Sequence, residues 1–124
     1  MLNPNPRWQV QFYQDAQGRR PVEEWVRALS EKEQTRVRRT LGLLMDYGTQ
    51  LGMPHSRHLR GKLWELRIAA GRDDYRILYV AKSGRRFFLL HAFPKKTAKT
   101  PERELAIAER RLAELEVRLK GEAK

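Results

Sequence analysis

Basic side chains recur along three consecutive segments that have the composition of β-strands. The segments are residues 63–69, 75–81 and 86–93, which are rich in β-branched and aromatic side chains, and Gly71-Arg72-Asp73 and Ser83-Gly84 separate them. Short glycine-containing connections of this kind predict hairpin turns. The three segments are therefore expected to lie side by side in an antiparallel sheet.

The register of the two hairpins decides which basic side chains meet. A two-residue turn in the first hairpin places Arg67 opposite Arg76, and a two-residue turn in the second places Arg76 opposite His91. Residues opposite each other in an antiparallel pair share one face of the sheet, where two like charges destabilise it. The expected row of Arg67, Arg76 and His91 therefore indicates a binding site for an anion. A slip of one residue in either hairpin would scatter this row.

These cations, with Lys95 and Lys96 at the end of the third segment, suit the cleavage of a phosphodiester without a metal. One guanidinium group can bind two phosphate oxygens at once through parallel hydrogen bonds. Its positive charge would offset the negative charge that grows on the phosphorane. Histidine can transfer protons near neutral pH, and so can a lysine whose pKa is lowered by cationic neighbours. If the substrate is RNA, its own 2′-hydroxyl can be the nucleophile, so no serine or cysteine nucleophile is needed.

Structural explanations of the same residues stay open. Arg67 and Arg76 could be ordinary strand residues paired to Glu65 or Asp74. His91 could be a hydrogen-bonded structural histidine, and the two lysines that follow it could be exposed loop charge.

The remaining chain predicts one further strand and three helices. Residues 8–13 alternate large and polar side chains, which indicates a strand. Pro21 is expected to open a helix, and Ser30 with Glu33 predicts the capping box of a second helix. Gly48 is expected to end that second helix.

A final helix is expected to begin at Thr100-Pro101, and residues 49–62 are expected to form a loop. Pro94 is expected to end the last strand, because proline cannot donate to a ladder. The expected fold is α+β, a small antiparallel sheet with the element order β-α-α-β-β-β-α, in a single domain over residues 1–124.

Positive charge is concentrated in the middle of the chain. The 26 Lys and Arg residues against 15 Asp and Glu residues give a net charge of +11, and residues 47–100 hold twelve basic and three acidic side chains. Nine of the eleven excess charges therefore lie in this part of the chain. A local positive field of this size attracts phosphate backbones or an acidic protein.

The composition excludes several classes of protein. The chain has no cysteine, which excludes a disulfide framework, a thiolate metal site and thiol catalysis. His55 and His58 are expected to be loop residues without a metal, since no acidic or thiol group nearby in the sequence completes a site. No cofactor is expected. Without a membrane span of ~18 apolar residues or a secretory signal, we expect a cytoplasmic protein with no membrane partner.

A specific motif string runs through the second half of the chain. It consists of Leu63-Trp64-Glu65-Leu66-Arg67, of Tyr75-Arg76-Ile77-Leu78-Tyr79, and of Leu89-Leu90-His91-Ala92-Phe93-Pro94-Lys95-Lys96-Thr97 with the following Lys99-Thr100-Pro101. In this string the chain resembles the phage-derived, HigB-type branch of the RelE/ParE toxin superfamily, and the resemblance covers about residues 8–115. It implies a RelE-like fold and the toxin of a type II toxin–antitoxin system. Such toxins cleave mRNA in the ribosomal A site without a metal, by attack of the 2′-hydroxyl that leaves a 2′,3′-cyclic phosphate.

The resemblance also implies roles for individual residues. Arg67 and Arg76 would bind the phosphate, while His91, Lys95 and Lys96 are candidates for proton transfer and RNA contact. The sequence lacks the catalytic tyrosine that the RelE subgroup has near its C-terminus, so Lys95 and His91 rank above Tyr75 as the general base. Further candidates for RNA contact are Arg60, Lys62 and Lys99.

The implied partners are mRNA on the ribosome and a small helix-turn-helix antitoxin, with operator DNA bound only through the toxin–antitoxin complex. Two other functions stay open at this point. One is a ParE-like toxin that inhibits DNA gyrase, which needs no aligned pair of Arg67 and Arg76. The other is an RNA-binding module without catalysis, in which basic and aromatic strand residues would stack on bases.

Overall fold

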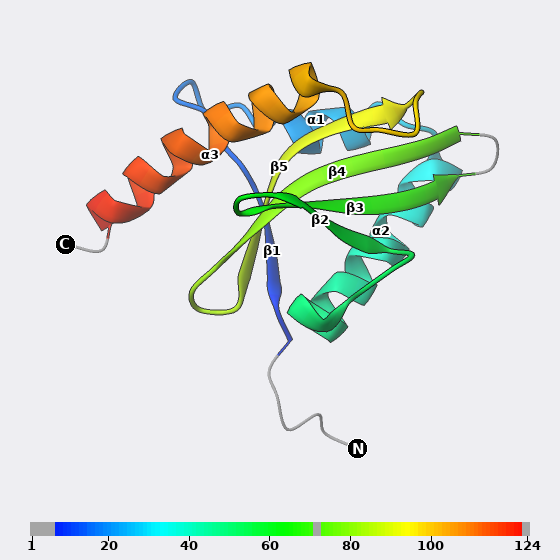
Figure 1. The fold of residues 1–124 in the computed structure, drawn as a ribbon, viewed down its shortest axis with the longest axis horizontal. Helices are drawn as coiled ribbons and strands as arrows, with labels where there is room; N and C mark the ends of the chain where they lie inside the picture. The colour runs from blue at the N-terminus through cyan, green and yellow to red at the C-terminus, as the bar shows by residue number, and fades with distance from the viewer. Residues whose placement is uncertain (1–6, 71–72, 123–124) are drawn as a thin grey trace.

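The computed structural model describes residues 7–70 and 73–122 (Figure 1), which form a five-stranded sheet with helices on both faces. The elements in chain order are β1 (Gln9–Phe12), α1 (Pro21–Arg27), α2 (Glu31–Tyr47), the short 3-10 helix η1 (Gly48–Gln50), β2 (Ser56–Arg60), β3 (Leu63–Ala70), β4 (Asp73–Lys82), β5 (Arg86–Lys95) and α3 (Glu102–Glu122). The strands lie side by side in the order β1-β5-β4-β3-β2. The predicted α+β class is confirmed.

Two features of the sheet differ from the expectation. The strands β2 to β5 are antiparallel, whereas β1 pairs with β5 in parallel. Residues 56–60, expected within a loop, form the edge strand β2. The pattern of β2 is hard to recognise because Leu59 is its only apolar residue, and an edge strand needs little apolar surface.

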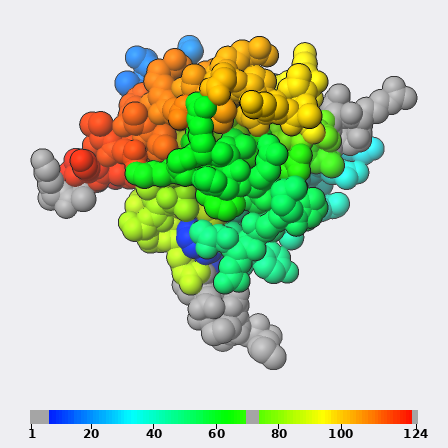
Figure 2. All heavy atoms as spheres, viewed as in Figure 1, coloured from blue at the N-terminus to red at the C-terminus, as the bar shows by residue number. Residues whose placement is uncertain are grey.

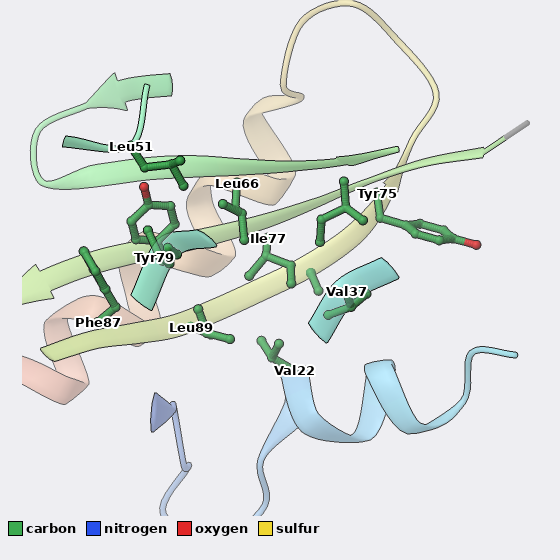
Figure 3. Packing of buried hydrophobic residues seen from close by; sticks show 12 residues of the cluster. Val22, Val37, Leu51, Leu66, Tyr75, Ile77, Tyr79, Phe87 and Leu89 are labelled. Atoms are coloured by element: carbon green, nitrogen blue, oxygen red, sulfur yellow. The ribbon is translucent and has the colours of Figure 1, made fainter. Parts of the chain in front are cut away.

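The two faces of the sheet hold separate cores. On one face, helices α1 and α2 insert Val22 and Val37 against Leu66, Ile77 and Leu89, all of which are fully or almost fully buried (Figure 3). On the other face, α3 packs its apolar stripe on residues of β4 and β5; the stripe consists of Leu105, Ala108, Leu112 and Leu115. Successive strand residues point to opposite faces, so this alternation fixes which side chains meet α3.

The predicted start of α1 and both predicted boundaries of α2 are confirmed. Pro21 is the first residue of α1, and the Ser30 hydroxyl and Glu33 carboxylate form the reciprocal capping box of α2. Gly48 ends α2 with a φ of 58°. A side chain at this position would also run into the Trp8 indole, so glycine is required there for two reasons.

The hairpins differ in how well the sequence predicts their register. Strands β3 and β4 pair as expected, although residues 71 and 72 of their connection lie outside the described residues. Strands β4 and β5 are joined by three residues rather than two, because Lys82 pairs with Arg86, and Gly84 and Arg85 both have positive φ. A bulge beside Leu78 shifts the register between β4 and β5 by one further residue.

The expected pairing of Arg76 with His91 is therefore wrong. Arg76 lies opposite Phe93, and His91 lies opposite Leu78. The two shifts of one residue add up to two, so His91 stays on the same face of the sheet as Arg76 but lies further along it, beneath α3.

The strand β5 also continues to Lys95 through Pro94, which was expected to end it. In the described part of the chain, this segment of β5 pairs with β4 alone, since β1 pairs no further than Leu89. Proline is tolerated where a strand forms the edge of a sheet, so Pro94 extends the strand and brings Lys95 opposite Asp74.

Candidate functional site

The predicted pairing of Arg67 with Arg76 is confirmed. The two residues lie opposite each other on β3 and β4, on the face of the sheet that α3 covers further along. Glu65 lies on the same face two residues before Arg67, because side chains alternate along a strand. Like charges opposite each other need a counter-charge, and Glu65 supplies it.

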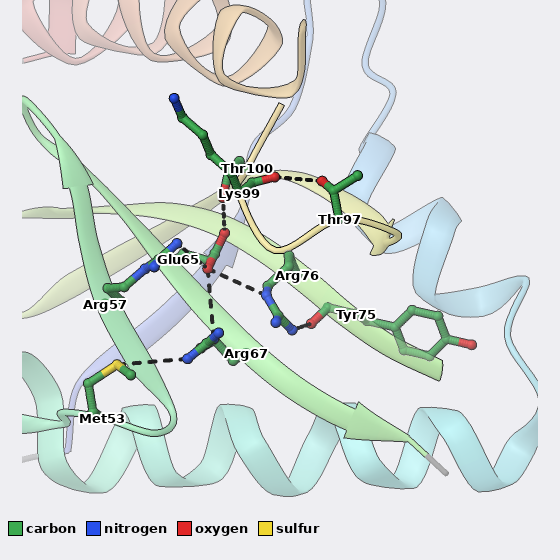
Figure 4. A network of polar contacts seen from close by, with 9 residues as sticks. All are labelled: Met53, Arg57, Glu65, Arg67, Tyr75, Arg76, Thr97, Lys99 and Thr100. Carbon is green, nitrogen blue, oxygen red and sulfur yellow. Dashed lines mark hydrogen bonds and ion pairs between the residues drawn. The ribbon is translucent and has the colours of Figure 1, made fainter. Parts of the chain in front are cut away.

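Glu65 is the centre of a buried charge cluster (Figure 4). Its side chain is 1% exposed, and its Oε1 atom lies 3.4 Å from Arg76 Nε, 3.4 Å from Arg57 Nη2 and 3.9 Å from Arg67 Nε. Its Oε2 atom accepts a 2.5 Å hydrogen bond from the Thr100 hydroxyl. Three guanidinium groups from three neighbouring strands thus surround one carboxylate. We call these four charged residues the Glu65 cluster, and it retains an excess of two positive charges.

Arg76 is the most buried of the three arginines, at 4% exposure. Its Nη1 atom donates to the carbonyl oxygen of Tyr75 at 3.1 Å, which fixes the plane of the guanidinium. Burial lowers the pKa of Arg76, an effect that Glu65 partly offsets and the charge of Arg67 increases. A cation held in such a poorly hydrated place interacts strongly with an incoming anion.

A hollow of about 570 Å³ opens beside the Glu65 cluster, between the end of β5, the connection to α3 and the first turn of α3. Its basic lining residues are Arg76, Lys95, Lys96, Lys99 and Arg103, and its acidic ones are Glu65, Glu102 and Glu104. We call it the β5–α3 hollow. Three of the predicted contact residues, Lys95, Lys96 and Lys99, are thereby brought together with Arg76.

Two other predicted contact residues are engaged elsewhere. Arg60 binds Glu102 at 2.9 Å and Glu109 at 2.6 Å, and Lys62 binds Glu116 at 2.6 Å. The hydrogen bonds that Arg60 donates to Glu109 and then to Glu102 raise its pKa. In Figure 2 the surface around β2 (green) meets that of α3 (orange), consistent with these ion pairs. Arg60 and Lys62 hold α3 on the sheet and do not line the β5–α3 hollow.

His91 is also separate from the β5–α3 hollow. Its Nε2 atom lies 3.0 Å from Glu104 Oε1, and its Nδ1 atom lies 3.3 Å from Arg111 Nη1. Arginine can only donate, so Nδ1 accepts and the Nε2 proton is donated to Glu104. Burial lowers the pKa of His91, and Glu104 only partly offsets it. His91 is therefore a neutral residue with both ring nitrogens occupied.

Sequence reasoning missed Arg57 and Thr100 as members of this site. It named Glu65 only as an ion-pair partner of Arg67 or Arg76, and that pairing is confirmed. Arg57 could not have been found from a local pattern, because residues 56–60 were expected to be loop, and Thr100 was considered only as the start of a helix. Within residues 7–70 and 73–122, no three side chains of His, Cys, Asp or Glu come together as metal ligands would.

No helix in the described part of the chain is long and apolar enough to cross a membrane. Comparison with curated proteins finds no match. The family model described as phage-derived protein Gp49-like (DUF891) matches residues 24–113, a range that includes the Glu65 cluster and the β5–α3 hollow. This family is in general one of RelE/HigB-type toxins. With most of its length matched, the chain belongs to the Gp49-like family.

Proposed function

We propose that this protein is the toxin of a type II toxin–antitoxin system and an endoribonuclease that cleaves mRNA on the ribosome without a metal. Membership of the Gp49-like family supports the toxin role. The observation that carries the nuclease role is the convergence of Arg57, Arg67 and Arg76 on one carboxylate, next to a hollow lined by further cations.

The Glu65 cluster is suited to hold a phosphate because its guanidinium groups are already positioned. Glu65 orients the three arginines from one side and neutralises only one of their charges. Holding like charges together in advance lowers the cost of arranging them around a phosphorane. Arg76 lines the β5–α3 hollow and is placed to contact the phosphate directly.

The proposed reaction is attack of the RNA 2′-hydroxyl oxygen on the adjacent phosphorus. The new O2′–P bond forms as the bond from phosphorus to O5′ breaks, and the products are a 2′,3′-cyclic phosphate and a 5′-hydroxyl. The proton of the 2′-hydroxyl is released to solvent water, and one proton is delivered to O5′. We assign the delivery to the ammonium group of Lys95, which lines the hollow together with Arg76.

We assign His91 the role of positioning Glu104. Its hydrogen bond to Glu104 fixes a residue in the first turn of α3 that lines the hollow. The partner that restrains the toxin would be a small helix-turn-helix antitoxin, and operator DNA would be bound only through their complex.

The occupied nitrogens of His91 favour a second candidate function, RNA binding without cleavage. Primer extension on mRNA in a translating extract separates the two. We expect new 5′ ends when the wild-type protein is added. We expect Arg76→Lys to reduce cleavage about 100-fold or more, because lysine keeps the charge but loses the planar pair of donors.

The control variant is Arg110→Ala, which removes an exposed arginine of α3 and should cleave as the wild type does. Circular dichroism shows whether each variant is folded. Absence of new 5′ ends with a wild-type protein that binds ribosomes would support the second candidate. Full cleavage by folded Arg76→Lys would contradict the role of the Glu65 cluster.

A further inference from the structure

A second basic hollow lies on the other side of Arg76 and Lys95. Its volume is about 410 Å³, and it is enclosed by α2, by the chain just before β2, and by β3 and β4. We call it the α2–β3 hollow. Arg76 and Lys95 line both this hollow and the β5–α3 hollow, so the two hollows are adjacent.

The wall that α2 contributes has a helical period. Arg36, Arg39, Thr40 and Leu43 line the hollow, a spacing of three and four residues that places them on one face of the helix. Figure 4 shows Arg67 on β3 near α2, and Arg67 lines the same hollow. One face of α2 thus adds two arginines to the basic residues of the sheet.

Among the side chains that the structure describes, these two arginines have no internal counter-ion. Arg60, Arg76 and Lys62 each approach a carboxylate, whereas no ion pair joins Arg36 or Arg39 to any described acidic side chain. Of the acidic side chains that the structure describes, only Asp74 lines the α2–β3 hollow. A hollow with this excess of positive charge is suited to a phosphate.

We propose that the α2–β3 hollow is a second phosphate subsite, in which Arg36 and Arg39 bind the RNA backbone next to the phosphate held at Arg76. The inference rests on the proposed RNA substrate. The strand would pass over Arg76 and Lys95, which the two hollows share. The protein then contacts consecutive phosphates of one strand.

The test is binding of 2′-O-methyl RNA, which cannot be cleaved by its own 2′-oxygen, so binding is measured apart from catalysis. We expect Arg39→Gln and Arg36→Gln each to weaken the affinity for an eight-nucleotide RNA about fivefold at 0.1 M salt. Each should also reduce the slope of log K against log salt by about 0.7, the value for one phosphate contact on a single strand.

Arg38→Gln is the matched control, since Arg38 is an exposed neighbour on α2 that lines neither hollow and binds Thr35 at 3.2 Å. It should bind RNA as the wild type does. A dinucleotide has only one phosphate, so its affinity, measured by NMR titration, should be unchanged in Arg39→Gln. An equal loss for both lengths would contradict the claim that one strand fills both hollows.

The outcomes distinguish this inference from the proposed function. If Arg36→Gln and Arg39→Gln bind the longer RNA as Arg38→Gln does, the subsite is wrong, even if the wild type cleaves mRNA. If the wild-type protein does not bind the longer RNA at all, the subsite is also wrong. If the two variants lose affinity as expected but mRNA is not cleaved, the subsite stands and the endonuclease proposal falls.

Discussion

Thr100 donates its hydroxyl hydrogen to Oε2 of Glu65 at 2.5 Å, and this contact joins the connection between β5 and α3 to the middle of the sheet. Both side chains are buried. The other carboxylate oxygen faces three arginines. One residue therefore orients the cationic groups of the site and also closes the loop that carries Lys96 and Lys99.

Replacing Thr100 with valine should loosen this connection. The variant keeps the shape of the side chain but leaves Oε2 of Glu65 without its donor, and a hydrogen bond to a charged group contributes about 2 kcal/mol. We expect the free energy of unfolding in urea to fall by about that amount, and amide exchange to accelerate in residues 96–100.

Thr97→Val is the control for the Thr100 variant, because the Thr97 hydroxyl donates to the Lys99 carbonyl in an exposed part of the same connection. Its effect on the free energy of unfolding should be much smaller. Equal stability of Thr100→Val and Thr97→Val would show that the buried hydrogen bond does not hold the loop.

Removal of the charge at Glu65 should leave three guanidinium groups without their counter-ion. We expect Glu65→Gln to lower the free energy of unfolding by about 3 kcal/mol, the usual cost of breaking a buried ion pair from one side. Sulfate should then raise the melting temperature of the variant more than that of the wild type, because an anion can take the place of the carboxylate.

The matched control is Glu109→Gln, which removes an exposed carboxylate bound to Arg60 that does not line the β5–α3 hollow. Its melting temperature should respond to sulfate as the wild type does. A Glu65→Gln protein that gains nothing from sulfate would argue against an anion site at the Glu65 cluster.

The state of His91 predicts a pH dependence of stability. Burial holds the pKa of His91 below its ordinary value of 6.5, so the unfolded chain binds a proton more readily than the folded one. The stabilisation is fully present above pH 6.5 and is lost as the pH falls through the pKa of the folded state. We expect the free energy of unfolding to decrease between pH 7 and pH 5.

His91→Gln should remove this part of the pH dependence, whereas His58→Gln, at an exposed histidine of β2, should not. An NMR titration gives the direct measurement. A His91 resonance that titrates above pH 6.5 would mean that the ring is protonated in the folded protein and ion-paired to Glu104.

The sequence predicts the pairing of Arg67 with Arg76 because only two residues separate β3 from β4 and no bulge interrupts the described pairing of the two strands. It does not predict the position of His91. A turn with two residues of positive φ and a bulge beside Leu78 each move the register by one residue, and neither has a distinctive residue pattern here.

Some residues of the site are brought together by tertiary contacts that no local sequence pattern encodes. Arg57 reaches Glu65 because β2 pairs with β3, and Thr100 reaches it because α3 folds back over the sheet. Local periodicity reports which face of an element is buried, but it does not report which polar groups meet across the sheet.

Lys95 is the residue on which the proposed chemistry depends most directly. If its ammonium group protonates O5′, Lys95→Gln should reduce the rate of cleavage about 100- to 10,000-fold, the usual contribution of a general acid. A substrate in which sulfur replaces the leaving 5′ oxygen needs no such proton, because a thiolate is a good leaving group. The variant should then cleave the sulfur substrate nearly as fast as the wild type does.

The control variant for Lys95 is Lys96→Gln. Lys96 lines the same hollow, so this variant should weaken RNA binding without the selective rescue by the sulfur substrate. Rescue of both variants, or of neither, would remove Lys95 from the role of general acid.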